Sequence, residues 1–124
     1  MKLRFRENSL RLRVNQREVR TLAAGSALRE EVRFPGDTRI SYVLQPATAD
    51  SPSASFVGGA IVVTAPLRDV EQWANGDQIG IYFDLPTSGT RLRVAIEKDL
   101  ECIDAPVEER DPHAFPRQAG GKIC

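Results

Sequence analysis

Apolar and polar residues alternate strictly in two short runs near the start of the chain, Lys2–Arg6 and Leu10–Val14. A period of two is typical of a β-strand with one face buried and the other in solvent. The segment between them, Glu7–Ser9, is short and polar, as the turn of a hairpin requires. The start of the chain therefore predicts two antiparallel strands.

A helix is predicted directly after this hairpin. Asn15 is a favourable N-cap, and Glu18 lies three residues later, where it completes a capping box. Gly25 is placed to end the helix in a left-handed conformation. The i, i+3, i+4 spacing puts the apolar residues on one helical face, which consists of Val19, Leu22 and Ala23.

Two further strands, Leu28–Phe34 and Arg39–Leu44, are predicted on either side of Pro35–Asp37, which has the residues of a turn. The segment Ala47–Ser53 is rich in alanine, serine, proline and threonine, so we interpret it as a surface linker within the domain. The order of elements in this half is therefore ββαββ.

The same order of signals returns after the linker. The predicted elements are the strands Ala54–Val57 and Ala60–Thr64, a helix beginning near Pro66, and the strands Ile79–Leu85 and Arg91–Glu97. The apolar stripe of this second helix consists of Val70, Trp73 and Ala74. Because Trp73 lies on that stripe, we predict a core residue and not a platform for a ligand.

A shift of 51 residues aligns the two halves without a gap from Lys2 to Pro35, and one extra residue in the second turn then brings Ile40 onto Leu92. Under this shift the inward-facing positions of the strands coincide, and so do the apolar faces of the two helices. The glycine that ends each helix and the proline of the turn coincide as well. The alternative is that any two ββαββ segments look alike when common loop lengths separate their elements. We interpret the pattern as an internal duplication, with pseudo-repeats 2–45 and 53–97 in a single domain of residues 1–124.

The predicted fold class is α+β, with the two ββαββ repeats forming a mainly antiparallel curved sheet or barrel of about eight strands and two helices. Periodicity ends after Leu100, and we expect residues 101–124 to be an irregular tail wrapped on the domain.

Composition and charge narrow the class of protein only a little. The chain has 124 residues, and seventeen basic side chains balance seventeen acidic ones, so net charge favours neither nucleic acid nor a membrane as partner. No signal peptide and no apolar run of membrane-spanning length is predicted. Cys102 and Cys124 are too few for a disulfide framework, which favours a cytoplasmic location.

The chain resembles a family of small, uncharacterised bacterial proteins. The residues that carry the resemblance are Met1–Arg4, Asn8–Arg13, Ser53–Phe56, Val94–Cys102 (above all Glu97, Lys98, Asp99 and Cys102), Ala114–Pro116 and the terminal Cys124. This resemblance implies no activity and no site, because none is established for that family.

Four arginines of the first hairpin, Arg4, Arg6, Arg11 and Arg13, are expected to project from one face, where they can bind phosphates or carboxylates. Residues 1–20 hold seven basic and two acidic side chains, whereas residues 97–111 hold seven acidic and two basic ones. The alternative is therefore that the acidic tail packs near the basic hairpin and neutralises it. No aromatic residue shares the face of the arginines, so nucleic acid is not the expected partner.

A second candidate site is the segment Glu97, Lys98 and Asp99 with Cys102, which combines an amine, two carboxylates and a thiol after the last strand. Burial of Lys98 would lower its pKa and make the amine a nucleophile, but a lysine at a strand end more often reaches solvent.

A third candidate is the set Cys102, His113 and Cys124, which with a carboxylate has the donors of a zinc site. Its spacing fits no standard ligand motif, so we predict no metal and no cofactor.

We therefore expect a cytosolic binding or interaction module without catalytic activity, whose partner is a protein or a small anionic ligand. The alternative is a small enzyme or metal-binding protein that uses residues 97–102 or the cysteines and histidine of the tail.

Overall fold

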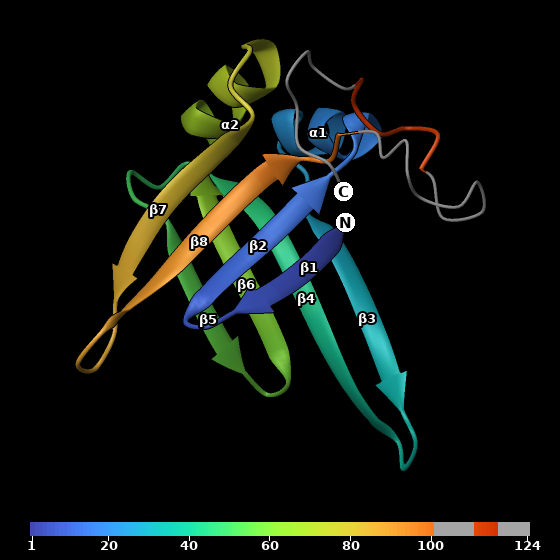
Figure 1. The fold of residues 1–124 in the computed structure, drawn as a ribbon, viewed down its shortest axis with the longest axis vertical. Helices are drawn as coiled ribbons and strands as arrows, with labels where there is room; N and C mark the ends of the chain where they lie inside the picture. Colours follow the sequence, from blue (N-terminus) through green and yellow to red (C-terminus); the bar gives the residue numbers. More distant parts are fainter. Residues whose placement is uncertain (101–110, 117–124) are drawn as a thin grey trace.

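A computed structural model describes residues 1–100 and 111–116 of the chain. The first half contains β1 (Lys2–Arg6), β2 (Ser9–Val14), α1 (Gln16–Ala23), β3 (Leu28–Phe34) and β4 (Thr38–Ala47). The second half contains β5 (Ser53–Val57), β6 (Ala60–Pro66), α2 (Leu67–Asn75), β7 (Gly80–Pro86) and β8 (Arg91–Lys98). The α+β class and the doubled ββαββ order are therefore confirmed (Figure 1).

The strands form two four-stranded sheets, and each sheet takes one hairpin from each half of the chain. Sheet A has the order β1-β2-β8-β7, and sheet B has the order β3-β4-β6-β5. The hairpins are antiparallel, whereas the central contacts β2–β8 and β4–β6 are parallel. The predicted curved sheet or barrel is thus corrected to two mixed sheets that do not close, because each has two edge strands that pair with no further strand of the described residues.

The register of the central pairs supports the duplication. Leu10 of β2 lies opposite Val94 of β8, and the equivalent residues Ile61 and Tyr42 lie opposite each other in β6 and β4. The two helices also occupy equivalent places, since each connects the hairpin of one sheet to a hairpin of the other sheet. The two halves therefore follow the same path through the fold.

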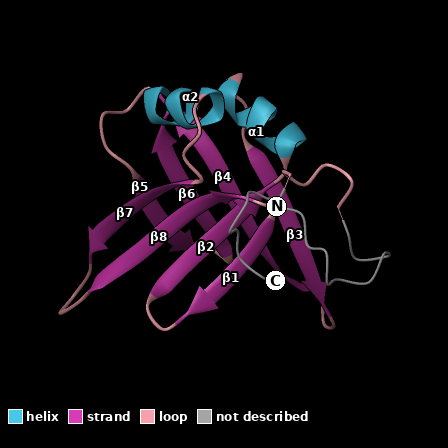
Figure 2. Cartoon of the chain, turned by 45° about the horizontal axis from the view of Figure 1, so that its top comes forward, coloured by secondary structure: helices cyan, strands magenta, loops and turns pink. Residues whose placement is uncertain are grey.

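Both helices lie across the same end of the two sheets, as Figure 2 shows. α1 begins at the predicted capping box, in which the amide N–H of Glu18 donates to Asn15 Oδ1 and the amide N–H of Asn15 donates to Glu18 Oε1. Trp73 of α2 is only 1% exposed, and its indole N–H donates to the carbonyl oxygen of Ile79 at 2.9 Å. The prediction that Trp73 is a core residue is therefore confirmed.

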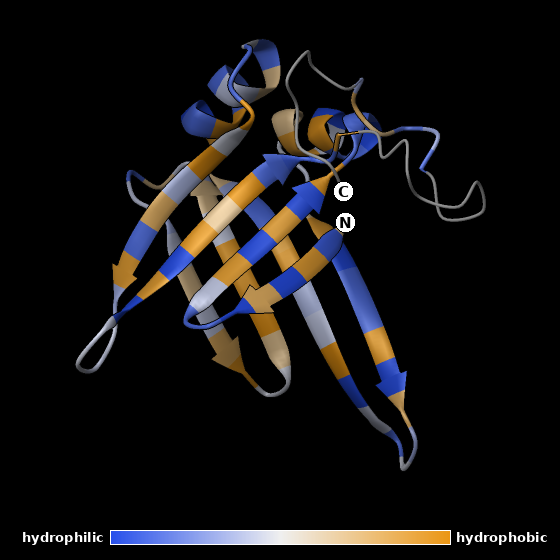
Figure 3. Cartoon of the chain, in the orientation of Figure 1, coloured by the Kyte–Doolittle hydropathy of each residue, from blue (hydrophilic) through white to orange (hydrophobic). Residues whose placement is uncertain are grey.

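The core lies between the inner faces of the two sheets and beneath the helices. Figure 3 shows apolar and polar bands alternating along several strands, as expected when one face of a strand is buried. The least exposed members of the core are Leu12, Val14, Leu22, Leu44, Val63, Ala65, Trp73 and Ile96. Most of them belong to the half of each strand that is nearer the helices.

All four hairpin turns lie at the other end of the molecule, away from the helices (Figure 1). The apolar side chains next to three of these turns are exposed, and they are Phe5, Val32, Phe34, Phe56 and Val57. The two sheets are therefore closed by helices at one end, whereas apolar surface remains uncovered at the other.

Candidate functional site

The outer face of sheet A carries the arginines that the alternation predicted. Three successive cross-strand pairs of β1 and β2 face outward, namely Lys2 with Arg13, Arg4 with Arg11, and Arg6 with Ser9. Like charges directly opposite each other destabilise a sheet. Two of these pairs therefore oppose folding unless carboxylates or a ligand neutralise them.

Carboxylates of β8 and of the residues just after it neutralise part of this charge. Glu97 is only 6% exposed, yet it forms an ion pair with Arg11 Nε at 3.1 Å and accepts a hydrogen bond from the Tyr82 hydroxyl at 2.6 Å. Burial and the hydrogen bond to Glu97 raise the pKa of Tyr82 to about 12. Asp99, which is 5% exposed, pairs with Lys2 at 2.8 Å. Arg11 and Lys2 are therefore compensated.

Part of the predicted neutralisation by the acidic tail is thus present, through Glu97 and Asp99. Residues 101–110 and Cys102 lie outside the described residues. Within residues 1–100 and 111–116, no ion pair joins Arg4, Arg6 or Arg13 to a carboxylate. Strand β8 adds Arg91 and Arg93, which share Asp84 of β7 at 3.4 and 3.9 Å.

Four residues of the hairpin surround a small depression on this outer face. Arg4, Arg6, Ser9 and Arg11 line a space of about 50 Å³, which we name the arginine hollow. One water molecule occupies about 30 Å³ in the liquid, so the hollow has room for one or two groups of that size, such as the oxygens of a phosphate or carboxylate. A wider depression of about 400 Å³ adjoins it over Ala95, between Arg11, Tyr82 and Arg93.

The structure does not bring Lys98 together with its two acidic neighbours. Glu97 and Asp99 pair with residues of the outer face. Lys98 occupies one of the alternate positions of β8 that face the inner side of the sheet. Its Nζ donates to the carbonyl oxygen of Gly76 at 3.0 Å and lies 5.5 Å from the centre of the Phe115 ring. The amine therefore has a structural partner at the helix end of the molecule.

The described part of the tail packs against the start of α1. Asp111 accepts a hydrogen bond from Asn15 Nδ2 at 2.9 Å, and this bond lowers the pKa of its carboxyl group. His113 Nε2 lies 3.5 Å from an Arg17 guanidinium nitrogen. The described residues contain no group of histidine, cysteine and carboxylate side chains that could hold a metal ion, while Cys102 and Cys124 lie outside them.

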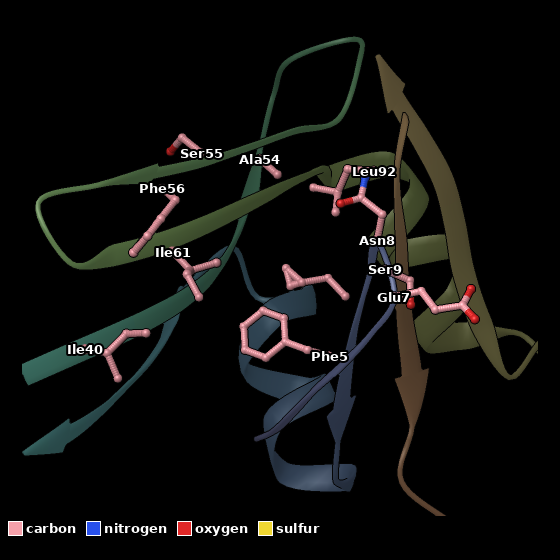
Figure 4. A pocket seen from close by; sticks show the side chains of 11 residues that line it. Phe5, Glu7, Asn8, Ser9, Ile40, Ala54, Ser55, Phe56, Ile61 and Leu92 are labelled. Atoms are coloured by element: carbon pink, nitrogen blue, oxygen red, sulfur yellow. The ribbon is translucent and has the colours of Figure 1, made fainter. Parts of the chain in front are cut away.

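An apolar cleft between the sheets was not predicted from the sequence. It has a volume of about 370 Å³, and its lining includes Glu7 and Asn8 of the β1–β2 turn. Three pairs of residues that the duplication relates line it, and they are Phe5 with Phe56, Leu10 with Ile61, and Ile40 with Leu92. Figure 4 shows Phe5 and Phe56 approaching from opposite sheets, with the Glu7 carboxylate directed away. The recurrence of phenylalanine at equivalent places was the one sequence signal for this cleft.

A family model described as a family of unknown function, DUF7009, matches residues 1–119. The chain belongs to this family. A search of curated proteins and a search of solved structures each found no match. The prediction of an uncharacterised family is confirmed, and membership of DUF7009 assigns no activity to the arginine hollow or the cleft.

The helices of this DUF7009 protein do not suggest a membrane span. Over the part of the chain that the structure describes, no helix is long and apolar enough to cross a bilayer.

Proposed function

We propose that this protein is a non-catalytic binding module whose ligand is a small anion held on the outer face of the β1–β2 hairpin. The observation that carries the proposal is the arginine hollow, in which Arg4, Arg6 and Arg11 converge with the hydroxyl-bearing Ser9. Guanidinium groups donate two parallel hydrogen bonds to a phosphate or a carboxylate, which gives both affinity and orientation.

The cost of this charge arrangement supports a role in binding. Arg4 lies directly opposite Arg11, and Arg11 obtains its only carboxylate within the described residues from Glu97. Sequences that break a local rule of sheet stability tend to do so at functional sites. A bound anion would relieve the repulsion between Arg4, Arg6 and Arg11.

The size of the hollow favours a small ligand over a nucleic acid. Two aromatic residues line the neighbouring outer depression, namely Tyr82, whose hydroxyl donates to Glu97, and Phe83, which packs against the core. Binding of single-stranded nucleic acid usually relies on aromatic side chains on which successive bases stack. A compact phosphate or carboxylate is therefore the ligand that we propose.

Catalysis is not part of the proposal. An enzyme built on residues 97–102 would need the amine of Lys98 beside a carboxylate, whereas Glu97 and Asp99 pair with Arg11 and Lys2. The compartment that we propose is the bacterial cytosol, which the scarcity of cysteine supports.

The test is calorimetric titration with inorganic pyrophosphate and with citrate at low salt. We expect saturable binding of at least one of them, weakened by about tenfold or more in the double variant Arg4→Gln/Arg6→Gln, because charge-assisted hydrogen bonds are lost.

The matched control is Arg29→Gln/Arg33→Gln, which removes the same charge from the edge strand β3 of sheet B, where both side chains contact Glu31. It should change affinity by less than about twofold, since exposed charges act weakly at a distance. An equal loss of affinity in both double variants would mean that net charge alone causes the effect. The absence of saturable binding by the unmodified protein would refute the proposal.

A further inference from the structure

The arginine hollow and the apolar cleft lie on opposite faces of the same hairpin end. Alternate residues of β1 and β2 point to the two sides, so Phe5 and Leu10 line the cleft while Arg4, Arg6 and Arg11 line the hollow. Ser9, next to the turn, lines both. Because β1 is the edge strand of sheet A among the described residues, none of the strands described there separates the two spaces on that side.

We propose that the ligand is a single-chain anionic amphiphile, with its phosphate or carboxylate head at the arginine hollow and its alkyl or acyl chain in the apolar cleft. This inference rests on the proposed anion-binding function and adds the class of ligand. A molecule with both parts can pass around the β1–β2 hairpin end and contact both spaces at once.

The cleft is suited to an alkyl chain by its lining and its size. Apart from Glu7, Asn8, Ser9 and Ser55, every residue that lines it is apolar. Its volume of about 370 Å³ falls in the range of about 300–1,000 Å³ that is usual for small-molecule sites. The Asn8 amide already donates to the carbonyl oxygen of Arg91 at 2.7 Å, and the Ser9 hydroxyl donates to that of Arg6. The lining therefore offers few free polar groups to a polar ligand.

Exposure of two phenylalanines also indicates an apolar occupant. Phe5 is 61% exposed and Phe56 is 67% exposed, although both belong to the inner faces of their sheets. A chain lying between them would cover apolar surface that otherwise contacts water. The head group should be anionic, because the outer face of the same hairpin is cationic.

The experiment compares three probes below the concentration at which micelles form. Decyl phosphate has both parts, inorganic phosphate has only the head, and decyl maltoside has the same chain with a neutral head. Each buried methylene raises affinity by about fourfold, so decyl phosphate should bind about thirtyfold or more tightly than inorganic phosphate. It should also bind at least about tenfold more tightly than decyl maltoside, which cannot pair with arginine.

Two single variants separate the cleft from the hollow. Phe56→Ala should weaken decyl phosphate by about five- to tenfold and leave inorganic phosphate unchanged, because it removes one wall of the cleft only. Val57→Ala is the matched control, since Val57 is the next residue, is 75% exposed and does not line the cleft. It should change neither affinity. Thermal melting of both variants checks that they remain folded.

The outcomes distinguish this inference from the function on which it rests. If inorganic phosphate binds as tightly as decyl phosphate, the amphiphile is wrong and the anion module stands. If decyl maltoside binds as tightly as decyl phosphate and Arg4→Gln/Arg6→Gln has no effect, both proposals are overturned. If sedimentation shows that the protein is a dimer and that Phe56→Ala dissociates it, a second copy of the chain covers the cleft. The inference of an amphiphile is then also overturned.

Discussion

The two equivalent hairpins β1–β2 and β5–β6 have similar inner faces and different outer faces. The inner pairs are Phe5 and Phe56, Leu10 and Ile61, Leu12 and Val63, and Val14 and Ala65. The outer pairs are Lys2 and Ser53, Arg4 and Ser55, Arg6 and Val57, Arg11 and Val62, and Arg13 and Thr64. The fold needs apolar residues at the inner positions of both hairpins, but β5–β6 shows that it does not need cations at the outer ones.

The contrast between the two hairpins separates residues that packing requires from residues that are free to differ. Packing requires apolar residues at equivalent positions of both halves, so the positions that are apolar in both identify the core. Charge on an outer face is free to differ, and here it costs stability on one hairpin because like charges lie opposite each other. The cationic face of β1–β2 is therefore the stronger candidate for a selected property.

The largest expected effect is on stability and tests whether equivalent core residues of the two helices both stabilise the fold. Leu22 and Trp73 occupy equivalent places on α1 and α2, and each is 1% exposed. Trp73→Ala should lower the free energy of unfolding by about 3–5 kcal/mol and Leu22→Ala by about 2–5 kcal/mol, measured by urea unfolding. Glu71→Ala on the exposed side of α2 is the control and should change it by less than about 0.5 kcal/mol. A loss in only one of the two would contradict the equivalence.

A second effect tests the buried carboxylate of the outer face. Sheet B has neutral Gln45 where sheet A has Glu97, and Gln45 donates to Thr64 at 3.0 Å. Glu97→Gln should lower the free energy of unfolding by about 1–3 kcal/mol, because a buried hydrogen bond to a charged group is weakened. It should also raise pyrophosphate affinity about threefold by releasing Arg11.

The more exposed Asp84 supplies the control for this effect, since it contacts Arg91 and Arg93 at longer distances. Asp84→Asn should leave the free energy of unfolding within about 0.5 kcal/mol of the unmodified protein. Unchanged stability in Glu97→Gln would mean that the pair between Glu97 and Arg11 contributes nothing.

A third effect comes from exchanging residues between the hairpins. Arg4→Ser/Arg6→Val gives β1 two of the three outer residues of β5, and it should weaken pyrophosphate binding by about tenfold while slightly raising the melting temperature. The reciprocal variant Ser55→Arg/Val57→Arg should not create an anion site, because Val62 stands where the first hairpin has Arg11. Tight pyrophosphate binding by the reciprocal variant would show that any pair of arginines suffices.

The smallest effect is spectroscopic and compares the two sheets through their tyrosines. Tyr82 of sheet A donates to Glu97, and Tyr42 of sheet B donates to Glu30 at 2.7 Å. Burial and these glutamates raise both pKa values to about 12, against about 10 for an unperturbed tyrosine.

Since each folded pKa is raised, the related stability is present below about pH 10 and is lost as pH rises through about 12. Absorbance at the phenolate band should show both tyrosines ionising together near pH 12, with half the amplitude left in Tyr82→Phe or Tyr42→Phe. A phenolate step near pH 10 in the folded protein would contradict both hydrogen bonds.

Local patterns were sufficient to predict much of this molecule. The alternation of Leu10, Leu12 and Val14 with Arg11 and Arg13 identified a strand, its buried face and its cationic face. The capping box at Asn15 and the stripe with Trp73 located the helices and a core residue. These features follow from the geometry of one strand or one helix, in which side-chain direction depends only on position along the element.

Tertiary structure alone decided how these elements pair. Alternation specifies which face of β2 is buried, but it does not specify that β2 pairs with β8. The two separate sheets, each with one hairpin from each half of the chain, were therefore not predicted. The same pairing brings Glu97 beside Arg11 and Asp99 beside Lys2, and it forms the cleft between Phe5 and Phe56. Strand partners are chosen by long-range contacts that no local period encodes, which is why the sequence determined the faces and only the fold determined the site.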